Sequence, residues 1–178
     1  MPGMRGDNVI IVGFMGAGKS VCGRLLARRL GRCFVETDDM IVARDGRPIP
    51  RIFTEEGEAR FRTLEAEVLE ALRLKSGDVI ATGGGLPCHD GRMALLRSLG
   101  TVVWLAGDMR DLEERARRTG TRPMLDGRSR EEIDALYRAR EPYYREADVT
   151  IETSGLGVDQ VVARVLSALS ERSHGARV

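Results

Sequence analysis

The chain has 178 residues, the length of one ordinary globular domain, and we predict a single domain over residues 1–178. Its 28 basic residues almost cancel its 27 acidic residues, and the net charge of +1 offers no long-range field that would attract nucleic acid. No apolar run is long enough to cross a bilayer and the first residues lack the pattern of a signal peptide, so we expect a cytoplasmic protein that does not bind membranes.

Short apolar runs alternate along the chain with stretches whose apolar residues recur at helical spacing. In chain order, the pattern predicts a strand at 8–12, a helix at 19–30, a strand at 33–37, helical segments within 38–73, a strand at 78–82, a helix at 91–99, a strand at 101–106, helices at 108–118 and 130–146, a strand at 148–152 and a helix from 158 to about 169. Residues 46–50 and Gly57 interrupt the helical segments. Ser129 and Glu132 have the spacing of a capping box, and residues 170–178 are expected to fray.

Five strands that alternate with helices predict an α/β fold, in which a parallel sheet is covered on both faces to give three αβα layers. The chain shows no internal repeat and no linker. No apolar surface helix is evident, so we expect a monomer.

Residues 13–20 read GFMGAGKS and match the pattern GxxxxGK[ST] between a predicted strand and a predicted helix. In such a P-loop, backbone N–H groups point at phosphate oxygens, the lysine spans the β- and γ-phosphates and the serine hydroxyl binds Mg²⁺. We therefore expect ATP and Mg²⁺ as cofactors. The expected nucleotide contacts in this segment are Gly16, Ala17, Gly18, Lys19, Ser20 and Val21.

The P-loop does not identify the acceptor, since kinases, GTPases, motor ATPases and regulatory nucleotide sensors all carry one. The chain lacks the NKxD and DxxG motifs of GTPases. The predicted strand at 78–82 ends in three glycines, where larger ATPases usually carry an acidic residue. Gly83, Gly84 and Gly85 would expose backbone N–H groups where open α/β sheets bind ligands, although a tight turn also uses glycine.

Charged residues follow the second predicted strand and the helical stretch after it. Glu36, Asp38 and Asp39 end that strand, which the usual neighbour rule places beside the P-loop. Carboxylates there can hold the Mg²⁺ hydration shell or accept a substrate hydroxyl proton, and Asp38 can instead cap a helix. Arg62 and Glu65 lie at i and i+3 on a predicted helix, where a surface salt bridge is the simplest interpretation.

The three cysteines, Cys22, Cys33 and Cys88, form no CxxC or Cys/His pattern. Neither a disulfide framework nor a zinc site is expected from an odd number at these spacings. We expect small buried thiols.

Six segments taken in order give a more specific result: GFMGAGKS, the carboxylates after the second strand, IFTEEGEARFRTLE, ATGGG, RTGTRPML and AREPYYREAD. Together they resemble the shikimate kinase family from one end of the chain to the other. The resemblance implies the nucleoside-monophosphate-kinase-like P-loop kinase fold with a five-stranded parallel sheet. It also implies transfer of the ATP γ-phosphoryl group to the 3-hydroxyl of shikimate, giving ADP and 3-phosphoshikimate, in chorismate and aromatic amino-acid biosynthesis.

The resemblance also implies how the acceptor is bound. Asp38 grips the substrate hydroxyls, and Arg62 pairs with the substrate carboxylate together with Arg140. Two planar guanidinium forks around one carboxylate give orientation as well as charge neutralisation. Gly84 and Gly85 offer backbone contacts to the same ligand.

By the same resemblance, a helical segment at about 38–65 binds the substrate and a lid at about 118–129 closes over it. Arg122 is the lid arginine that covers the transferring phosphoryl group. Arg118 either lies near adenine or is simply a solvated helix end. The implied catalytic residues are Lys19, Asp38 and Arg122.

The chain departs from the family pattern at Glu36, where the family has the first Asp of an FxDxD element. The longer side chain keeps the charge and can hold Mg²⁺ through water, so we expect Ser20 and Glu36 at the metal. Two alternatives to a shikimate kinase are a gluconate-type sugar-acid kinase and a catalytically weak, regulatory nucleotide-binding domain. The second alternative rests on Glu36.

Overall fold

Five parallel strands form one sheet at the centre of the structure, in the order β2-β3-β1-β4-β5. The computed structural model describes residues 8–118 and 127–175. The strands are β1 (Asn8–Val12), β2 (Phe34–Glu36), β3 (Val79–Ala81), β4 (Gly100–Ala106) and β5 (Val149–Glu152). The helices are α1 (Lys19–Leu30), α2 (Thr37–Asp45), α3 (Ile49–Ala71), the 3₁₀ turn η1 (Leu72–Leu74), α4 (Arg92–Leu99), α5 (Met109–Arg118), α6 (Arg130–Tyr144) and α7 (Val158–Gly175).

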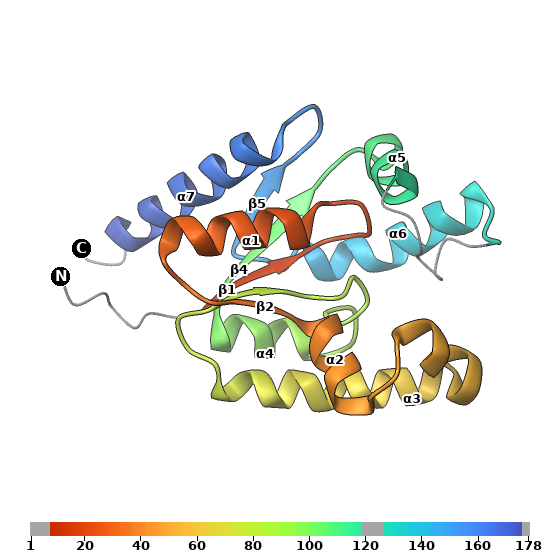
Figure 1. Cartoon of the computed structure of the whole chain (residues 1–178). Coiled ribbons are helices and arrows are strands. Elements are labelled where there is room, and N and C mark those ends of the chain that lie inside the picture. The colour runs from red at the N-terminus through yellow and green to blue at the C-terminus, as the bar shows by residue number, and fades with distance from the viewer. Residues whose placement is uncertain (1–7, 119–126, 176–178) are drawn as a thin grey trace.

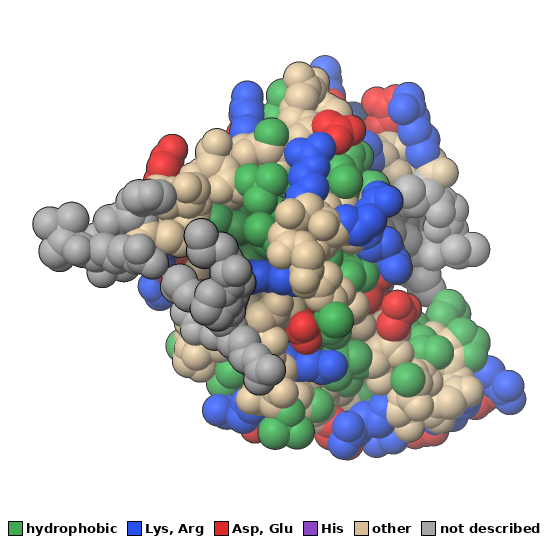
Figure 2. All heavy atoms as spheres, turned by 60° about the vertical axis from the view of Figure 1, so that its left-hand side comes forward, with side chains coloured by type: hydrophobic (Ala, Val, Ile, Leu, Met, Phe, Trp, Pro, Cys, Tyr) green, Lys and Arg blue, Asp and Glu red, His purple; other side chains and the backbone are tan. Residues whose placement is uncertain are grey.

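Helices cover both faces of this sheet. α1 and α7 lie side by side on one face, and α3 and α4 lie on the other side (Figure 1). The predicted three-layer αβα fold with a five-stranded parallel sheet is therefore confirmed. The face in Figure 2 mixes basic with acidic side chains, in keeping with the small net charge of +1. None of the helices in the described ranges is both long and apolar enough to cross a membrane.

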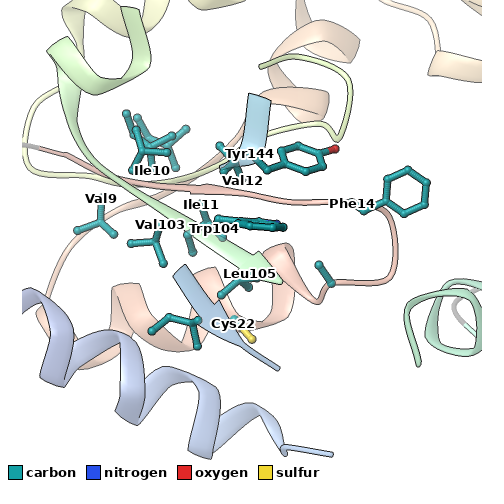
Figure 3. Packing of buried hydrophobic residues seen from close by; sticks show 14 of the residues in the cluster. Val9, Ile10, Ile11, Val12, Phe14, Cys22, Val103, Trp104, Leu105 and Tyr144 are labelled. Atoms are coloured by element: carbon teal, nitrogen blue, oxygen red, sulfur yellow. The ribbon is translucent and has the colours of Figure 1, made fainter. Parts of the chain in front are cut away.

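The central strand β1 is buried along its whole length, because β3 and β4 flank it and helices cover both faces. Figure 3 shows Ile10, Ile11 and Val12 in this core with Trp104 and Tyr144. The rings of the last two lie 6.0 Å apart. Full burial of a valine or isoleucine side chain, as in β1, contributes roughly 1.5–3 kcal/mol to stability. The end of β1 is thus a rigid base for the P-loop that follows it.

The strand order corrects one expectation. The neighbour rule placed the residues after β2 beside the P-loop, which holds for Glu36, but the adjacency of β1 and β2 behind that rule is wrong, because β2 pairs with β3. All three residues of β3 are buried, whereas all three of β2 are half-buried, so the more apolar strand takes the inner position. The glycines after β3 therefore follow the strand that lies between β1 and β2.

A smaller apolar cluster joins α2 to α3, apart from the main core. Its buried members are Ile41, Ile52, Phe61, Leu64 and Val68. Gly57 breaks α3 with a φ of 78°, at the predicted interruption. The predicted capping box of Ser129 and Glu132 is also confirmed, at the start of α6.

The C-terminal helix is longer than expected. It continues to Gly175, so the prediction that it ends near residue 169 and frays beyond is wrong for residues 170–175. Arg172 donates a hydrogen bond to the carbonyl oxygen of Asp148 at 3.2 Å, which anchors the last turns to the start of β5. Residues 176–178 lie outside the described ranges.

Candidate active site

A cavity of about 840 Å³ opens where the sheet ends at β1, β2 and β3. This size is typical of a small-molecule site, for which the range is roughly 300–1,000 Å³. Its lining joins residues 15–22 of the P-loop and α1 to residues 82–85 after β3, and it includes Asp38, Arg62 and Arg140. Every predicted site residue in the described part of the chain lines this cavity.

The P-loop forms the donor end of the cavity, between β1 and α1. Gly16 has a φ of 78°, and a side chain there would collide with the carbonyl group of Leu112 on α5, so both conformation and space require glycine. Lys19 is buried, and its ammonium donates hydrogen bonds to the carbonyl oxygens of Gly13 and Phe14 at 2.8 and 3.0 Å. This ammonium and the N-terminus of α1 make the donor end positive, as phosphate groups require.

Ser20 and Glu36 meet beside the P-loop. The Ser20 hydroxyl donates a hydrogen bond to Oε1 of Glu36, and Arg24 donates to Oε2 at 3.1 Å. Across the two described ranges, no group of three or more His, Cys, Asp and Glu side chains forms a metal cage. Mg²⁺ usually keeps several waters and binds one or two protein groups together with substrate phosphates. A hydroxyl beside one carboxylate therefore fits Mg²⁺ that arrives with the nucleotide.

Two carboxylates hold Arg62 at the acceptor end. Its Nη1 donates to Oε2 of Glu65 at 2.8 Å, and its Nε and Nη2 donate to Oε1 of Glu58 at 3.2 and 2.7 Å. The Glu65 side chain is only 2% exposed, whereas that of Glu58 is exposed. The pair of Arg62 and Glu65 is therefore not a surface salt bridge, and Glu65 holds Arg62 from the interior. The pair of Arg62 and Glu58 is a surface salt bridge.

Arg140 on α6 is a buried cation at the same end. It is 8% exposed, and no carboxylate of residues 8–118 or 127–175 lies within 4.0 Å of its guanidinium. Arg140 and Arg62 converge on Gly85, where a Cβ would lie 3.0 Å from Nη2 of Arg140 and 2.9 Å from Nη1 of Arg62. Two guanidinium groups in this arrangement, one of them buried without an anion, suit a carboxylate ligand.

The glycine loop after β3 lies beside both the P-loop and Arg140, since a Cβ on Gly84 would stand 3.5 Å from the carbonyl oxygen of Gly13 and 3.4 Å from Nη1 of Arg140. The Gly83 N–H donates to the Thr37 hydroxyl at 2.8 Å, so the expectation that it is exposed to ligand is wrong for this residue. The Tyr144 hydroxyl donates to the carbonyl oxygen of Gly84 at 2.7 Å and fixes the loop. Oδ1 of Asp38 lies 2.6 Å from where a Cβ of Gly83 would stand. Gly83 therefore makes room for Asp38.

Asp38 lies in the first turn of α2, whereas the N-cap position belongs to Glu36. The alternative of Asp38 as the helix cap is therefore wrong. Phe53 and Phe61 line the same part of the cavity, with ring centroids 4.7 Å apart. A carboxylate opposite apolar rings suits an acceptor with hydroxyl groups on a carbon ring.

The far donor end is formed by α5 and the loop before α7. Arg118 lines the cavity, and its side chain is 75% exposed and pairs with Glu114 at 2.6 Å, which fits both a solvated helix end and a residue that faces the nucleotide. Arg115 also lines the cavity and donates hydrogen bonds to Oγ1 and O of Thr153 at 3.3 and 3.0 Å. Sequence reasoning missed Arg115, because this helix carries several arginines and none follows a motif. Arg122 lies outside the described residues.

The cysteines differ from one another in burial. Cys22 is buried, and burial raises the pKa of its thiol to about 11. Cys88 is half-buried and donates a hydrogen bond to the carbonyl oxygen of Gly84 at 3.4 Å. Cys33 is exposed, so the expectation of buried thiols is wrong for this residue.

Comparison with known proteins identifies the family. A sequence profile named "Shikimate kinase" matches residues 15–170. A protein named shikimate kinase from Moorella thermoacetica is 43% identical over 169 residues, which cover 95% of each chain. One from Geobacter sulfurreducens is 42% identical over 167 residues, covering 93% of this chain and 92% of the other. A solved structure of shikimate kinase from Acinetobacter baumannii in complex with shikimate has a TM-score of 0.88, 36% identity and 94% coverage of both chains. The resemblance seen in the motifs is confirmed, and the chain is an enzyme of the shikimate kinase family.

Proposed function

We propose that this chain binds ATP at the P-loop and shikimate at the Arg62 and Arg140 end of the cavity, and transfers the γ-phosphoryl group to the 3-hydroxyl of shikimate. The products are ADP and 3-phosphoshikimate, on the route to chorismate and the aromatic amino acids. The names of the relatives and the shikimate in the A. baumannii structure support this acceptor.

The buried Arg140 is the observation that carries the choice of acceptor. A buried cation without an anionic partner is costly, and a ligand carboxylate removes that cost. Arg62 lies across Gly85 from it and supplies the second fork. Gly84 and Gly85 offer backbone contacts, and Asp38 lies where it can grip ring hydroxyls. The acceptor site thus combines the helical segment at about 38–65 with the glycine loop after β3 and with α6.

The donor roles follow from the P-loop. Residues 16–21 would hold the phosphates, with Lys19 on the β- and γ-phosphates. Ser20 and Glu36 would hold Mg²⁺, which supplies charge neutralisation on the phosphates when it is bound. Arg118 is proposed near the adenine.

The chemical step is a displacement at the γ-phosphorus. Asp38 accepts the proton of the 3-hydroxyl, the hydroxyl oxygen forms a bond to phosphorus, and the bond to the β–γ bridging oxygen breaks. ADP leaves with that electron pair, and Lys19 stabilises the charge that develops on it. We propose Arg122, in a lid at about 118–129, as the third catalytic residue on the ground of the family resemblance.

The experiment is a coupled ADP-release assay with shikimate and gluconate side by side, with and without Mg²⁺. Turnover with shikimate and Mg²⁺ alone is the expected result. Turnover with gluconate and none with shikimate would support a sugar-acid kinase, and ATP binding without turnover on either acceptor would support the regulatory domain. The Arg140→Ala variant should bind ATP like the wild type and lose turnover with shikimate.

We also propose that the protein is a cytoplasmic monomer that binds neither nucleic acid nor membranes. The net charge of +1 supports the part of this proposal that concerns nucleic acid. Light scattering coupled to gel filtration should give a mass near the 19.6 kDa of one chain, and a mass twice as large would refute the monomer.

A further inference from the structure

Arg92 is the first residue of α4 and does not line the cavity. It contacts Glu65, the carboxylate that holds Arg62 from the interior. Its Nη1 lies 3.4 Å from Oε2 of Glu65 and donates to the carbonyl oxygen of Leu86 at 3.0 Å. The same oxygen of Glu65 accepts from Nη1 of Arg62 at 2.8 Å. The side chain of Arg92 is 14% exposed. One buried carboxylate oxygen is thus shared by two guanidinium groups.

The charges of this cluster do not cancel. The arginines are Arg62, Arg92 and Arg140, and among residues 8–118 and 127–175 the carboxylates that pair with Arg62 or Arg92 are Glu58 and Glu65. Three cations against two anions leave one positive charge, which a single carboxylate ligand would neutralise. His89 adds no charge at neutral pH, because burial and the neighbouring Arg92 lower its pKa. Without Arg92, the cations and anions would be equal in number.

Arg92 also ties α3 to the glycine loop. Leu86, whose carbonyl oxygen it binds, directly follows Gly85, the residue on which Arg62 and Arg140 converge. A displacement of this carbonyl would move the loop against both guanidinium groups, because a Cβ on Gly85 would already stand 2.9 Å from Nη1 of Arg62 and 3.0 Å from Nη2 of Arg140.

We propose that Arg92 is a positioning residue for the acceptor carboxylate. By sharing Glu65, it leaves Arg62 with the net positive charge that binds the ligand, and through Leu86 it fixes the glycine loop beside Arg62. Arg92 acts through these neighbours and touches neither ATP nor the reacting hydroxyl. The inference rests on the proposed function and deepens it, by adding a determinant of affinity for a carboxylate-bearing acceptor.

The test is steady-state kinetics of Arg92→Ala, Arg92→Gln and Arg92→Lys, with Arg97→Ala as the matched control. Arg97 lies on the same helix but pairs with Asp148 at 3.2 Å, away from the cavity. The Ala and Gln variants should raise KM for shikimate about tenfold while KM for ATP and kcat stay within about twofold. Lysine should restore most of the affinity, since Arg92 uses a single nitrogen, Nη1, for both contacts.

A double variant separates the charge effect from a loosened fold. In a Glu65→Gln background, Arg92→Gln should raise KM for shikimate by only about two- to threefold, because the carboxylate that Arg92 offsets has lost its charge and only the contact with the carbonyl oxygen of Leu86 is removed. A wild-type KM for shikimate in Arg92→Gln would overturn the inference, and so would an equal rise in KM for ATP or an undiminished effect in the Glu65→Gln background. Wild-type turnover is measured first: its absence would refute the proposed function, whereas turnover with an unchanged Arg92→Gln would refute only the role of Arg92.

Discussion

The hydroxyl of Ser20 donates its hydrogen bond to Oε1 of Glu36, the residue at which this chain departs from the family's aspartate. Arg24 binds the other carboxylate oxygen, so the longer side chain is held at both oxygens and still reaches the P-loop. The extra methylene of glutamate therefore does not separate the carboxylate from Ser20.

Replacement of this carboxylate should weaken the binding of Mg²⁺. In Glu36→Gln, the Mg²⁺ concentration for half-maximal activity should rise about tenfold, because a charged group near the metal is lost. Calorimetry of ATP binding at several Mg²⁺ concentrations gives a second readout. Glu70→Gln, which removes an exposed carboxylate paired with Arg73, is the control. An unchanged Mg²⁺ requirement would remove Glu36 from the metal site.

Arg140→Met should separate affinity from stability. KM for shikimate should rise about 100-fold, since a charge-assisted pair with the ligand carboxylate is lost. The free energy of unfolding should equal or exceed that of the wild type, because a buried cation that pairs with no carboxylate of the described ranges is replaced by an apolar side chain. Urea titrations without ligands measure the second quantity. A loss of more than about 1 kcal/mol would mean that Arg140 serves the fold itself.

Glu58→Gln should improve the binding of the acceptor. Oε1 of Glu58 accepts hydrogen bonds from Nε and Nη2 of Arg62. A ligand carboxylate could bind this edge of the guanidinium group if Glu58 did not. An exposed pair of this kind is worth roughly 0.2–1 kcal/mol, so KM for shikimate should fall by up to about fivefold. Glu55→Gln, on the same helix but paired with Arg47 and Arg51, should leave KM unchanged. A rise in KM would show that Glu58 instead holds Arg62 in its binding orientation.

Stability should fall in acid through Asp45, the last residue of α2. Its side chain is 2% exposed, and Arg47 donates to both of its oxygens, at 2.6 and 3.0 Å. The hydrogen bonds from Arg47 lower the pKa of Asp45 below its ordinary value of 3.8. A depressed folded-state pKa stabilises the fold above the ordinary value, and this contribution is lost as the pH falls through the folded-state pKa.

Urea titrations between about pH 7 and pH 3 measure this dependence. Asp45→Asn should be less stable than the wild type at neutral pH, and the difference should shrink in acid. Asp159→Asn, at an exposed ion pair with Arg29, is the control. A constant difference between Asp45→Asn and the wild type across this range would contradict the linkage.

Sequence patterns were sufficient for the strands, for most helices and for the P-loop and acceptor residues of the cavity. Local signals explain this success: the P-loop glycines need particular backbone angles, and Ser129 with Glu132 caps its helix by short-range contacts. The failures arise where two strands distant in sequence compete for the same position in the sheet. The strand β2 was placed beside β1 because consecutive elements are usually neighbours, but the more apolar β3 occupies that position.

The parts of the site that sequence reasoning missed have no motif of their own. Arg92, Arg115 and Arg24 are three arginines in a chain whose basic residues are nearly all arginine. Each gains its role from a partner distant in sequence, as Arg92 does from Glu65 and from the carbonyl oxygen of Leu86. Such roles depend on packing between elements, which spacing along the chain does not encode.

The narrow space at Gly85 limits how this enzyme can diverge. Even the methyl group of alanine would press on both guanidinium groups, so a substitution of Gly85 would displace the two arginines that are proposed to bind the acceptor. A descendant that accepts a different ring would have to change the aromatic side at Phe53 and Phe61, where side chains have alternatives of similar size. Variation among such descendants should therefore accumulate on α3 while the glycine stays invariant.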